Sequence, residues 1–225
     1  MLPNTFLDWW FAPWSYASVL TQRLPLATDE LGRRDGYRLW CSEACINPDL
    51  PEKFDPAWTI VATSNGLELA ATARLFAGLL AAREHTHQVL RALSFADHKW
   101  CVSVAATQPL SQHWQINYSA DDSNTVRGLV YLACHIEHDF PGLWERLLLT
   151  LPIALANRAE YLRLNAVTLT NRSESSVLRT RRCWRLCHNR GQTMPSPTAV
   201  RQPIGMPSNI STNISTNMHD DEVVT

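Results

Sequence analysis

Charged residues are scarce in this sequence. Asp, Glu, Lys and Arg make up 18% of the 225 residues, the formal net charge is −1, and Lys53 and Lys99 are the two lysines. A chain with almost no net charge has no overall field that would draw it to nucleic acid or to an anionic membrane surface. We therefore predict neither of these as a partner.

Long hydrophobic runs are also lacking. The longest apolar stretch, 69–82, is interrupted by Arg74 and bordered by Glu68 and Arg83, whereas a membrane-spanning helix needs about 20 apolar residues. The apolar segment 1–10 has no positively charged region before it, so it does not resemble a secretory signal. We expect a cytoplasmic protein, in which the six cysteines stay reduced.

The motifs of common catalytic sites are missing as well. There is no glycine-rich phosphate loop, no G-x-S-x-G nucleophile elbow and no cofactor fingerprint. The cluster 135–138, His-Ile-Glu-His, differs from the H-E-x-x-H pattern that places two histidines and a glutamate around zinc. We interpret it as a solvated helix end and expect no enzyme activity, no metal and no cofactor.

Tryptophan, by contrast, is plentiful. Nine are present, and five of them precede residue 60: Trp9, Trp10, Trp14, Trp40 and Trp58. A small domain buries only some of so many rings, which favours an exposed aromatic patch and a protein contact. The alternative that all of them belong to the core stays open.

Helical periodicity is the main structural signal in the first half of the chain. A short helix is expected over 15–23 after the turn at Pro13, and a weaker one over 27–49. The clearest pattern runs over 67–93, as one central helix or two in succession, with Ser64 near its start as a cap.

The second half carries further helix patterns. Segment 100–116 is compatible with a short strand or with another helix. Two amphipathic helices are expected over 126–137 and 143–151, separated by the breaker at 139–142. Together these patterns predict an all-α or mainly α protein, an irregular helical domain over 1–172.

The composition changes after Ser173. Segment 179–190 has five arginines and no acidic residue, which indicates a basic helix over 173–190 whose attachment the sequence leaves open. From Gly191 onward the chain is rich in Pro, Ser, Thr and Asn. Because so few apolar groups cannot offset the entropy cost of ordering, we predict a disordered C-terminal tail over 191–225.

Two cysteine pairs and the basic helix give an alternative function. Cys41 and Cys45 are four residues apart, as are Cys183 and Cys187, so the four could in principle form a tetrahedral zinc site. The spacing differs from the usual C-x-x-C, and we favour two unrelated pairs of thiols. The arginines of 179–190 could contact RNA, so a zinc- or nucleic-acid-binding regulatory protein is the alternative.

Three stretches in order resemble the SctK family of bacterial type III secretion systems, whose members include YscK, PscK, OrgA and MxiK. The matching patterns are an aromatic Phe-x-Pro-x-x-Tyr-like segment followed by Arg-Leu, a leucine-rich central helix and a C-terminal helix pair. They lie at 10–16 with 23–24, at 67–80, and at 128–152. The resemblance covers about two-thirds of the chain.

The resemblance implies a non-catalytic adaptor in the cytoplasmic sorting platform beneath the injectisome. Such an adaptor links the inner-membrane ring protein SctD to the SctQ pods, with SctL and the ATPase attached further in, at the cytoplasmic face of the inner membrane. Aromatic residues on a turn are the type that dominates interface energies. We therefore predict that the partner-binding residues are Phe11, Pro13, Trp14, Tyr16 and Arg23.

Overall fold

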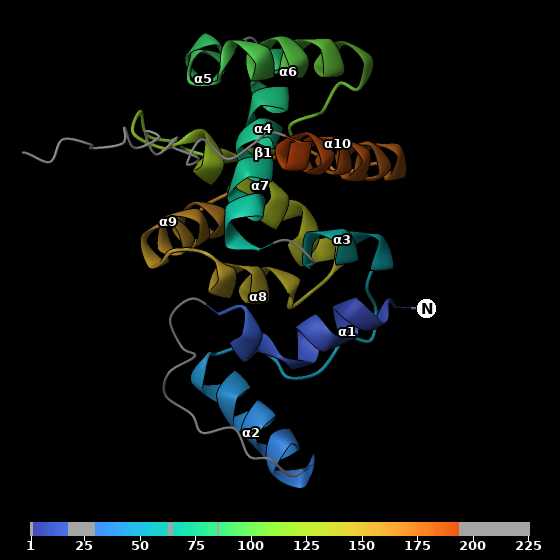
Figure 1. Ribbon diagram of the computed structural model, residues 1–225. Coiled ribbons are helices and arrows are strands. Elements are labelled where there is room, and N and C mark those ends of the chain that lie inside the picture. The colour runs from blue at the N-terminus through green and yellow to red at the C-terminus, as the bar shows by residue number, and fades with distance from the viewer. Residues whose placement is uncertain (1, 18–29, 63–64, 85, 194–225) are drawn as a thin grey trace, which may run out of the picture. The chain divides into compact units, whose positions relative to one another are not determined.

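The computed structural model describes residues 2–17, 30–62, 65–84 and 86–193, and their regular secondary structure is almost entirely helical (Figure 1). In chain order the elements are α1 (Asn4–Phe11), η1 (Pro13–Ser15), α2 (Glu30–Glu43), η2 (Pro56–Trp58), α3 (Thr59–Ala62), α4 (Gly66–Glu84), α5 (His87–Arg91), α6 (Phe95–Thr107), β1 (Trp114–Gln115), α7 (Asn124–Asp139), α8 (Leu143–Thr150), α9 (Ile153–Leu164), β2 (Val167–Thr168) and α10 (Glu174–Thr193). The predicted mainly α fold is confirmed.

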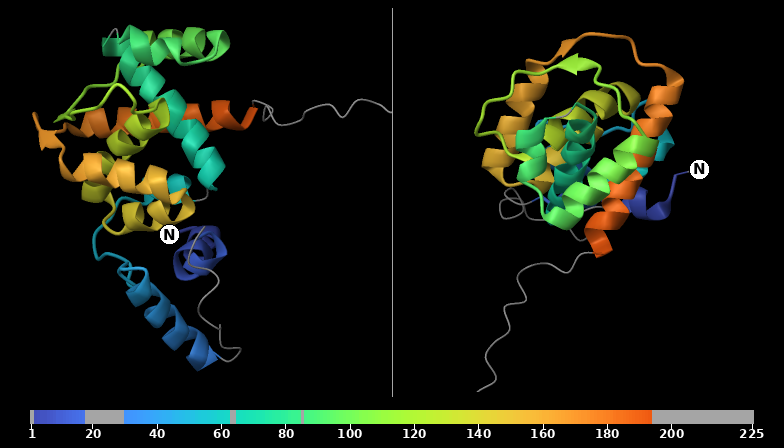
Figure 2. Two further views of the ribbon diagram at one scale, coloured as in Figure 1. Left: turned by 90° about the vertical axis from the view of Figure 1, so that its left-hand side faces the viewer. Right: turned by 90° about the horizontal axis from the view of Figure 1, so that it is seen from above.

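Helix α4 forms the centre of the core. It packs against α5, α6, α7 and α10, while α9 packs on the other side of α7. In Figures 1 and 2, α9 and α10 therefore lie on opposite sides of the α4–α7 pair. Leu69, Phe76 and Leu79 of α4 are fully buried, so the leucine-rich pattern marks the core of the fold.

The start of α4 is capped by a different residue from the one expected. The Oδ1 atom of Asn65 accepts hydrogen bonds from the backbone N–H groups of Leu67 and Glu68, each at 3.0 Å. These bonds satisfy donors that have no partner within the helix. Ser64, the predicted cap, lies outside the described residues.

The structure decides between alternatives that the sequence left open. The pattern over 67–93 gives two helices, α4 and α5, and 100–116 holds the end of α6 followed by the two-residue strand β1. Strand β1 pairs with β2 in an antiparallel register, Trp114 opposite Thr168. The predicted break after α7 is confirmed, because Gly142 has φ 84° at the start of α8.

Helix α10 is part of the helical core. Its Cys183, Trp184 and Cys187 are fully buried, and the Trp184 ring lies 5.3 Å from that of Phe76. The helix continues to Thr193 and so includes the first three residues of the tail that was predicted to start at 191. Residues 194–225, the rest of that predicted tail, lie outside the described part of the chain.

A second, smaller apolar cluster joins η1 to α2. It is formed by Ala17, Tyr37, Trp40, Cys41 and Ile46, with Trp14, Ala44 and Leu149 packed against it. The helix expected over 27–49 is therefore present in part, as α2. Of the helix expected over 15–23, only residues 15–17 are described. None of the helices in the described residues combines the length and hydrophobicity that a bilayer span requires.

The crossing of α4 and α7 depends on a glycine. A methyl group on Gly128 would lie 1.8 Å from the carbonyl oxygen of Ala73, a backbone atom that cannot move aside alone. We expect Gly128→Ala to lower the free energy of unfolding by at least about 2 kcal/mol, because the two helices would have to separate. Thermal or urea denaturation followed by circular dichroism measures the loss.

The matched control is Gly36→Ala, in the middle of α2. Nothing lies within 4 Å of the added methyl group there. Alanine has the higher helix propensity, so this variant should be more stable by about 0.5–1 kcal/mol. A Gly128→Ala protein as stable as wild type would show that the two backbones are not in contact.

Candidate functional site

Helix α1 is anchored to the core by two of its aromatic residues. Phe6 and Trp10 are fully buried, and the ring of each lies 5.6 Å from that of Phe140. Trp58 is also fully buried and Trp40 nearly so. These tryptophans belong to the apolar clusters, whereas Trp9 and Trp14 are half-buried.

The predicted partner-binding residues take different positions. Phe11 is 44% exposed, and Trp14 is half-buried beside it. Pro13 is buried, and its carbonyl oxygen accepts the Ala17 N–H at 3.1 Å. The half-buried Tyr16 ring stacks on the ring of Trp9 in α1, with 4.5 Å between the ring centres.

Phe11 and Trp14 are the two predicted residues that meet at a surface pocket. Their rings lie 5.6 and 6.3 Å from the ring of Tyr37, both in edge-on arrangements. Arg23, the fifth predicted residue, lies outside the described residues. Pro13 and Tyr16 contribute to the packing beneath this surface.

The pocket has a volume of about 430 Å³, and we call it the aromatic pocket. It is lined by Phe11, Trp14, Arg34, Tyr37, Arg38 and Asp49. Arg34 and Arg38 are one helical turn apart on α2, so their side chains leave the helix on the same side. Both are exposed. Three rings and two cations thus surround one opening.

A buried arginine lies behind this pocket. Arg146 of α8 is fully buried, and its guanidinium carbon lies 3.8 Å from the centre of the Trp10 ring. Its Nη2 donates to the Tyr37 hydroxyl at 2.8 Å, and that hydroxyl donates to the carbonyl oxygen of Pro48. Among the described residues, its Nε and Nη1 atoms find no acceptor.

The groups around Arg146 do not neutralise its charge. Burial raises the pKa of the Tyr16 and Tyr37 hydroxyls and of the Cys41 thiol, and the Arg146 cation offsets that rise only in part. All three groups therefore stay uncharged at neutral pH. No carboxylate of the described residues forms an ion pair with Arg146.

The sequence analysis missed Arg34, Tyr37, Arg38 and Arg146. A signal for Arg146 was available, since it lies on the buried stripe of α8 between Leu143 and Leu147. A cation in an apolar stripe indicates a special environment, because burying an unpaired charge costs several kcal/mol. The two arginines of α2 carry no such signal, because they become neighbours of Phe11 only in the folded chain.

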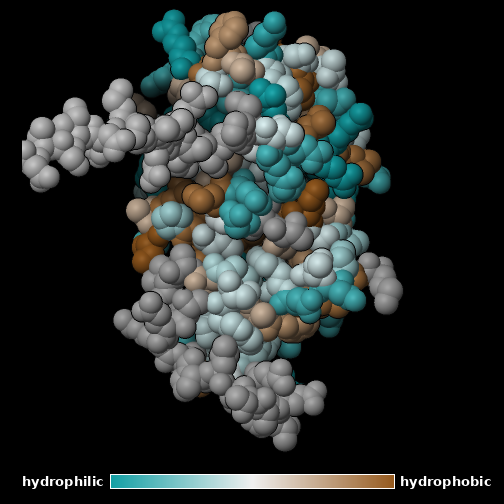
Figure 3. Space-filling view, in the orientation of Figure 1, coloured by the Kyte–Doolittle hydropathy of each residue, from teal (hydrophilic) through white to brown (hydrophobic). Residues whose placement is uncertain are grey.

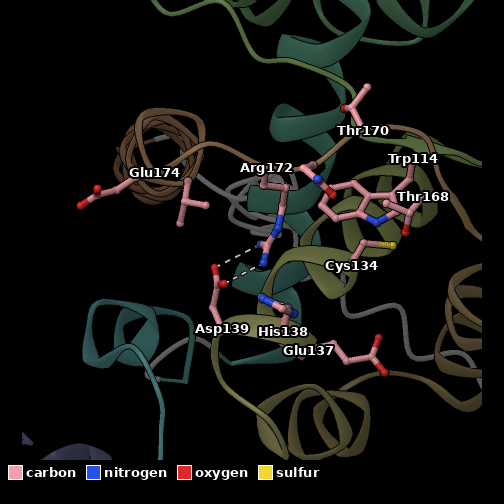
Figure 4. A pocket seen from close by; sticks show the side chains of 11 residues that line it. Trp114, Cys134, Glu137, His138, Asp139, Thr168, Thr170, Arg172 and Glu174 are labelled. Atoms are coloured by element: carbon pink, nitrogen blue, oxygen red, sulfur yellow. Dashed lines mark hydrogen bonds and ion pairs between the residues drawn. The ribbon is translucent and has the colours of Figure 1, made fainter.

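A second pocket, of about 700 Å³, lies where α7 meets β2 and the start of α10 (Figure 4). We call it the polar pocket. Arg172 projects into it and holds Asp139 through two hydrogen bonds, of 2.9 and 3.3 Å. The indole Nε1 of Trp58 donates to the same carboxylate at 3.1 Å. The charge of Asp139 is therefore fully paired.

His135 corrects one of our expectations. It is fully buried rather than part of a solvated helix end, because it lies one turn after Tyr131 on the face of α7 that packs against Trp114. Arg172 lies 3.3 Å from its Nδ1, and the Thr180 hydroxyl 3.4 Å from its Nε2. His138 is exposed, as expected.

A histidine–serine contact beside this network does not form a catalytic triad. The Nε2 atom of His113 lies 2.7 Å from the Ser176 hydroxyl, but both side chains are buried. The other ring nitrogen contacts the hydroxyl of Thr170 at 3.0 Å. A carboxylate normally occupies that third position, where it stabilises the protonated histidine. The geometry fits packing better than nucleophilic catalysis.

The cysteine pairs lie in different parts of the fold. Cys41 belongs to the small apolar cluster and Cys45 is exposed, whereas Cys183 and Cys187 are buried in the main core. Burial raises the pKa of Cys183 to about 11 and that of Cys187 as well, so both stay protonated. Across the described ranges, no three side chains of His, Cys, Asp or Glu are grouped as a metal ion would require.

Several arginines of α10 are used inside the fold. Arg181 pairs with Asp55, and Arg190 lies 3.7 Å from Asp97. Arg179 donates to the carbonyl oxygen of Pro109 at 3.1 Å. Arg182 and Arg185 are the exposed members of the basic segment. The surface that α10 could offer to RNA is therefore smaller than the sequence indicates.

Replacing Arg146 tests whether its buried charge lacks a counter-ion. Arg146→Met should raise the free energy of unfolding by about 1 kcal/mol, because an apolar chain of similar length removes a buried charge that lacks a counter-ion. The control is Arg172→Met, which would leave Asp139 without its cation and cost about 3 kcal/mol. Chemical denaturation measures the free energy of unfolding of both variants. Equal losses of stability in the two variants would contradict the difference in charge pairing between Arg146 and Arg172.

The buried histidines predict sensitivity to acid. Burial, and then the Arg172 cation, lower the pKa of His135 well below 6.5, and the same two causes lower the pKa of His113. The unfolded chain therefore binds more protons than the fold at pH values below about 6.5, and stability falls as the pH decreases from there. Each fully shifted histidine contributes up to about 1.4 kcal/mol per pH unit.

Urea denaturation between pH 7 and pH 5 measures this slope. His135→Gln should make the slope shallower, because the glutamine has no proton to gain. The control is His138→Gln, which changes an exposed histidine three residues further on. Equal slopes in the wild type and in His135→Gln would refute the assignment.

Comparison of the chain with family models, with curated proteins and with solved structures gives no match. The SctK resemblance therefore rests on the sequence patterns within 10–152. The geometry of the aromatic pocket is an independent observation on the same protein.

Proposed function

We propose that this chain is a non-catalytic adaptor of the type III secretion sorting platform, which links the inner-membrane ring protein SctD to the SctQ pods. SctL and the ATPase would be reached indirectly, through SctQ. The adaptor would stand at the cytoplasmic face of the inner membrane, held there by its partners. The observation that carries the proposal is the aromatic pocket.

The aromatic pocket has the composition of an interface hot spot. Tryptophan, tyrosine and arginine are the residues most enriched among hot spots, and Trp14, Tyr37 and Arg38 line this pocket together. Phe11 leaves 44% of its surface exposed next to them. Apolar rings grouped at one surface mark a contact site, whereas a single exposed ring does not.

An adaptor needs a second surface, and α9 with β2 offers one. Ile153, Tyr161, Leu164, Val167 and Leu169 are each more than half exposed. Figure 3 shows hydrophobic residues gathered at the surface over the α9 side of the domain. The nearby charges are paired with one another, since Arg163 contacts both Glu137 and Glu160. An apolar surface of this kind fits protein contact better than ligand chemistry.

The zinc- or nucleic-acid-binding alternative gains no comparable support. Its four cysteines are divided between two apolar clusters and the surface. Its arginines are in part engaged within the fold, as Arg181 is with Asp55. A second candidate function is therefore not proposed.

Substitutions in the aromatic pocket test the proposal. Trp14→Ala should weaken binding to the cytoplasmic domain of SctD or to SctQ by about 1–3 kcal/mol, the range of interface hot spots. Pull-down and calorimetry with the two partners of the same organism measure the loss. The helical circular dichroism signal should be unchanged, because Trp14 is only half-buried.

The matched control is Phe95→Ala. This phenyl ring is 84% exposed at the start of α6 and does not line the pocket, so its removal should change neither affinity nor stability. Tyr16→Ala should instead lower the melting temperature, since it removes the stack on Trp9. Failure of the wild-type chain to bind either partner would reject the adaptor function.

A further inference from the structure

We infer that the aromatic pocket binds an acidic segment of a partner protein, with carboxylates against Arg34 and Arg38 and an apolar side chain among the rings. This inference adds the ligand chemistry to the proposed function. It rests on that function only in taking the ligand to be a protein. The inference concerns the chemistry of the ligand and does not depend on which protein supplies it.

The charges that line the pocket are unbalanced. Arg34 and Arg38 are exposed, and neither forms an ion pair with a described carboxylate. Asp49 is the single carboxylate among the lining residues. The lining therefore carries a net positive charge, although the chain as a whole carries −1. A guanidinium pair one turn apart matches carboxylates, which it can bind through paired hydrogen bonds.

The buried Arg146 adds to this positive potential. It has two guanidinium nitrogens without acceptors and no carboxylate partner in the described residues. In an interior of low dielectric, the field of such a cation is weakly screened and extends to the nearest opening. Arg146 lies close to the pocket, because it donates a hydrogen bond to the hydroxyl of Tyr37, and the Tyr37 side chain lines the pocket. An anion bound there would supply the missing counter-charge.

The arrangement of the rings favours a peptide over a nucleic acid. Phe11 and Trp14 meet Tyr37 at interplanar angles of 65° and 73°, so neither ring lies parallel to Tyr37 in the way that would let a base of a single-stranded nucleic acid stack between them. A nucleic-acid surface also extends as a basic stripe along several phosphates. Here the lining holds two arginines and the carboxylate of Asp49 rather than a run of basic residues. An apolar side chain fits between edge-on rings.

Fluorescence anisotropy on the full-length chain tests the inference. The probe is a labelled peptide of Asp-Glu-Leu repeats, and its neutral counterpart has Asn-Gln-Leu repeats. We expect the acidic peptide to bind more tightly, and the double variant Arg34→Gln, Arg38→Gln to raise its dissociation constant about tenfold, from two partly exposed ion pairs. Because both arginines are exposed, the double variant should remain folded.

The matched control is the double variant Arg182→Gln, Arg185→Gln, which removes the same charge from the exposed side of α10 and should leave the dissociation constant unchanged. Arg146→Met should raise the constant about threefold, through loss of the buried field, without lowering the melting temperature. Equal binding of the two peptides, equal losses in both double variants, or tighter binding of a labelled oligouridylate would overturn the inference.

This result is separable from the test of the adaptor function. If SctD and SctQ fail to bind but the acidic peptide binds through Arg34 and Arg38, the adaptor function is rejected and the acidic-ligand site stands. If SctD or SctQ binds while the acidic and neutral peptides bind equally, the adaptor function stands and this inference is rejected.

Discussion

The backbone contact between α4 and α7 determines where the other helices can pack. Gly128 lies so close to the carbonyl oxygen of Ala73 that no side chain fits between them. Such a close crossing leaves both helices buried along much of their length, and α6, α9 and α10 then cover the sides that remain. The polar pocket lies at the edge of this assembly, whereas the aromatic pocket is lined by residues of the smaller apolar cluster, such as Trp14 and Tyr37.

The buried Arg146 and the partly buried Arg172 show how the same residue type can serve structure or remain open to function. Arg172 is paired with Asp139 through both of its terminal nitrogens and contacts His135 as well, so its polar groups are used within the fold. In the described residues, Arg146 has one hydrogen bond, to Tyr37, and two guanidinium nitrogens without acceptors. A fold tolerates such a charge at a cost in stability, and sites that bind ligands often carry that cost.

The two pockets differ as these two arginines do, in how far their charged groups are paired within the fold. The polar pocket is the larger, yet the ionic groups at its base are paired with one another, as Arg172 is with Asp139. The aromatic pocket is smaller, but it combines the exposed Phe11 ring with Arg34 and Arg38, which form no ion pair with a carboxylate of the described residues. Unpaired groups, rather than volume, make a surface able to gain free energy from a partner, because paired groups have already exchanged water for protein contacts.

The sequence by itself determined the helical class, the helical pattern within 67–93 and the break at Gly142, because periodicity and turn chemistry act between residues close along the chain. The sequence also predicted that aromatic residues near Phe11 contact a partner protein. Only the tertiary structure decided that His135 is buried, that α10 belongs to the core and that Arg146 lies behind Tyr37. Burial and charge pairing depend on which distant segments meet, and no local pattern encodes that.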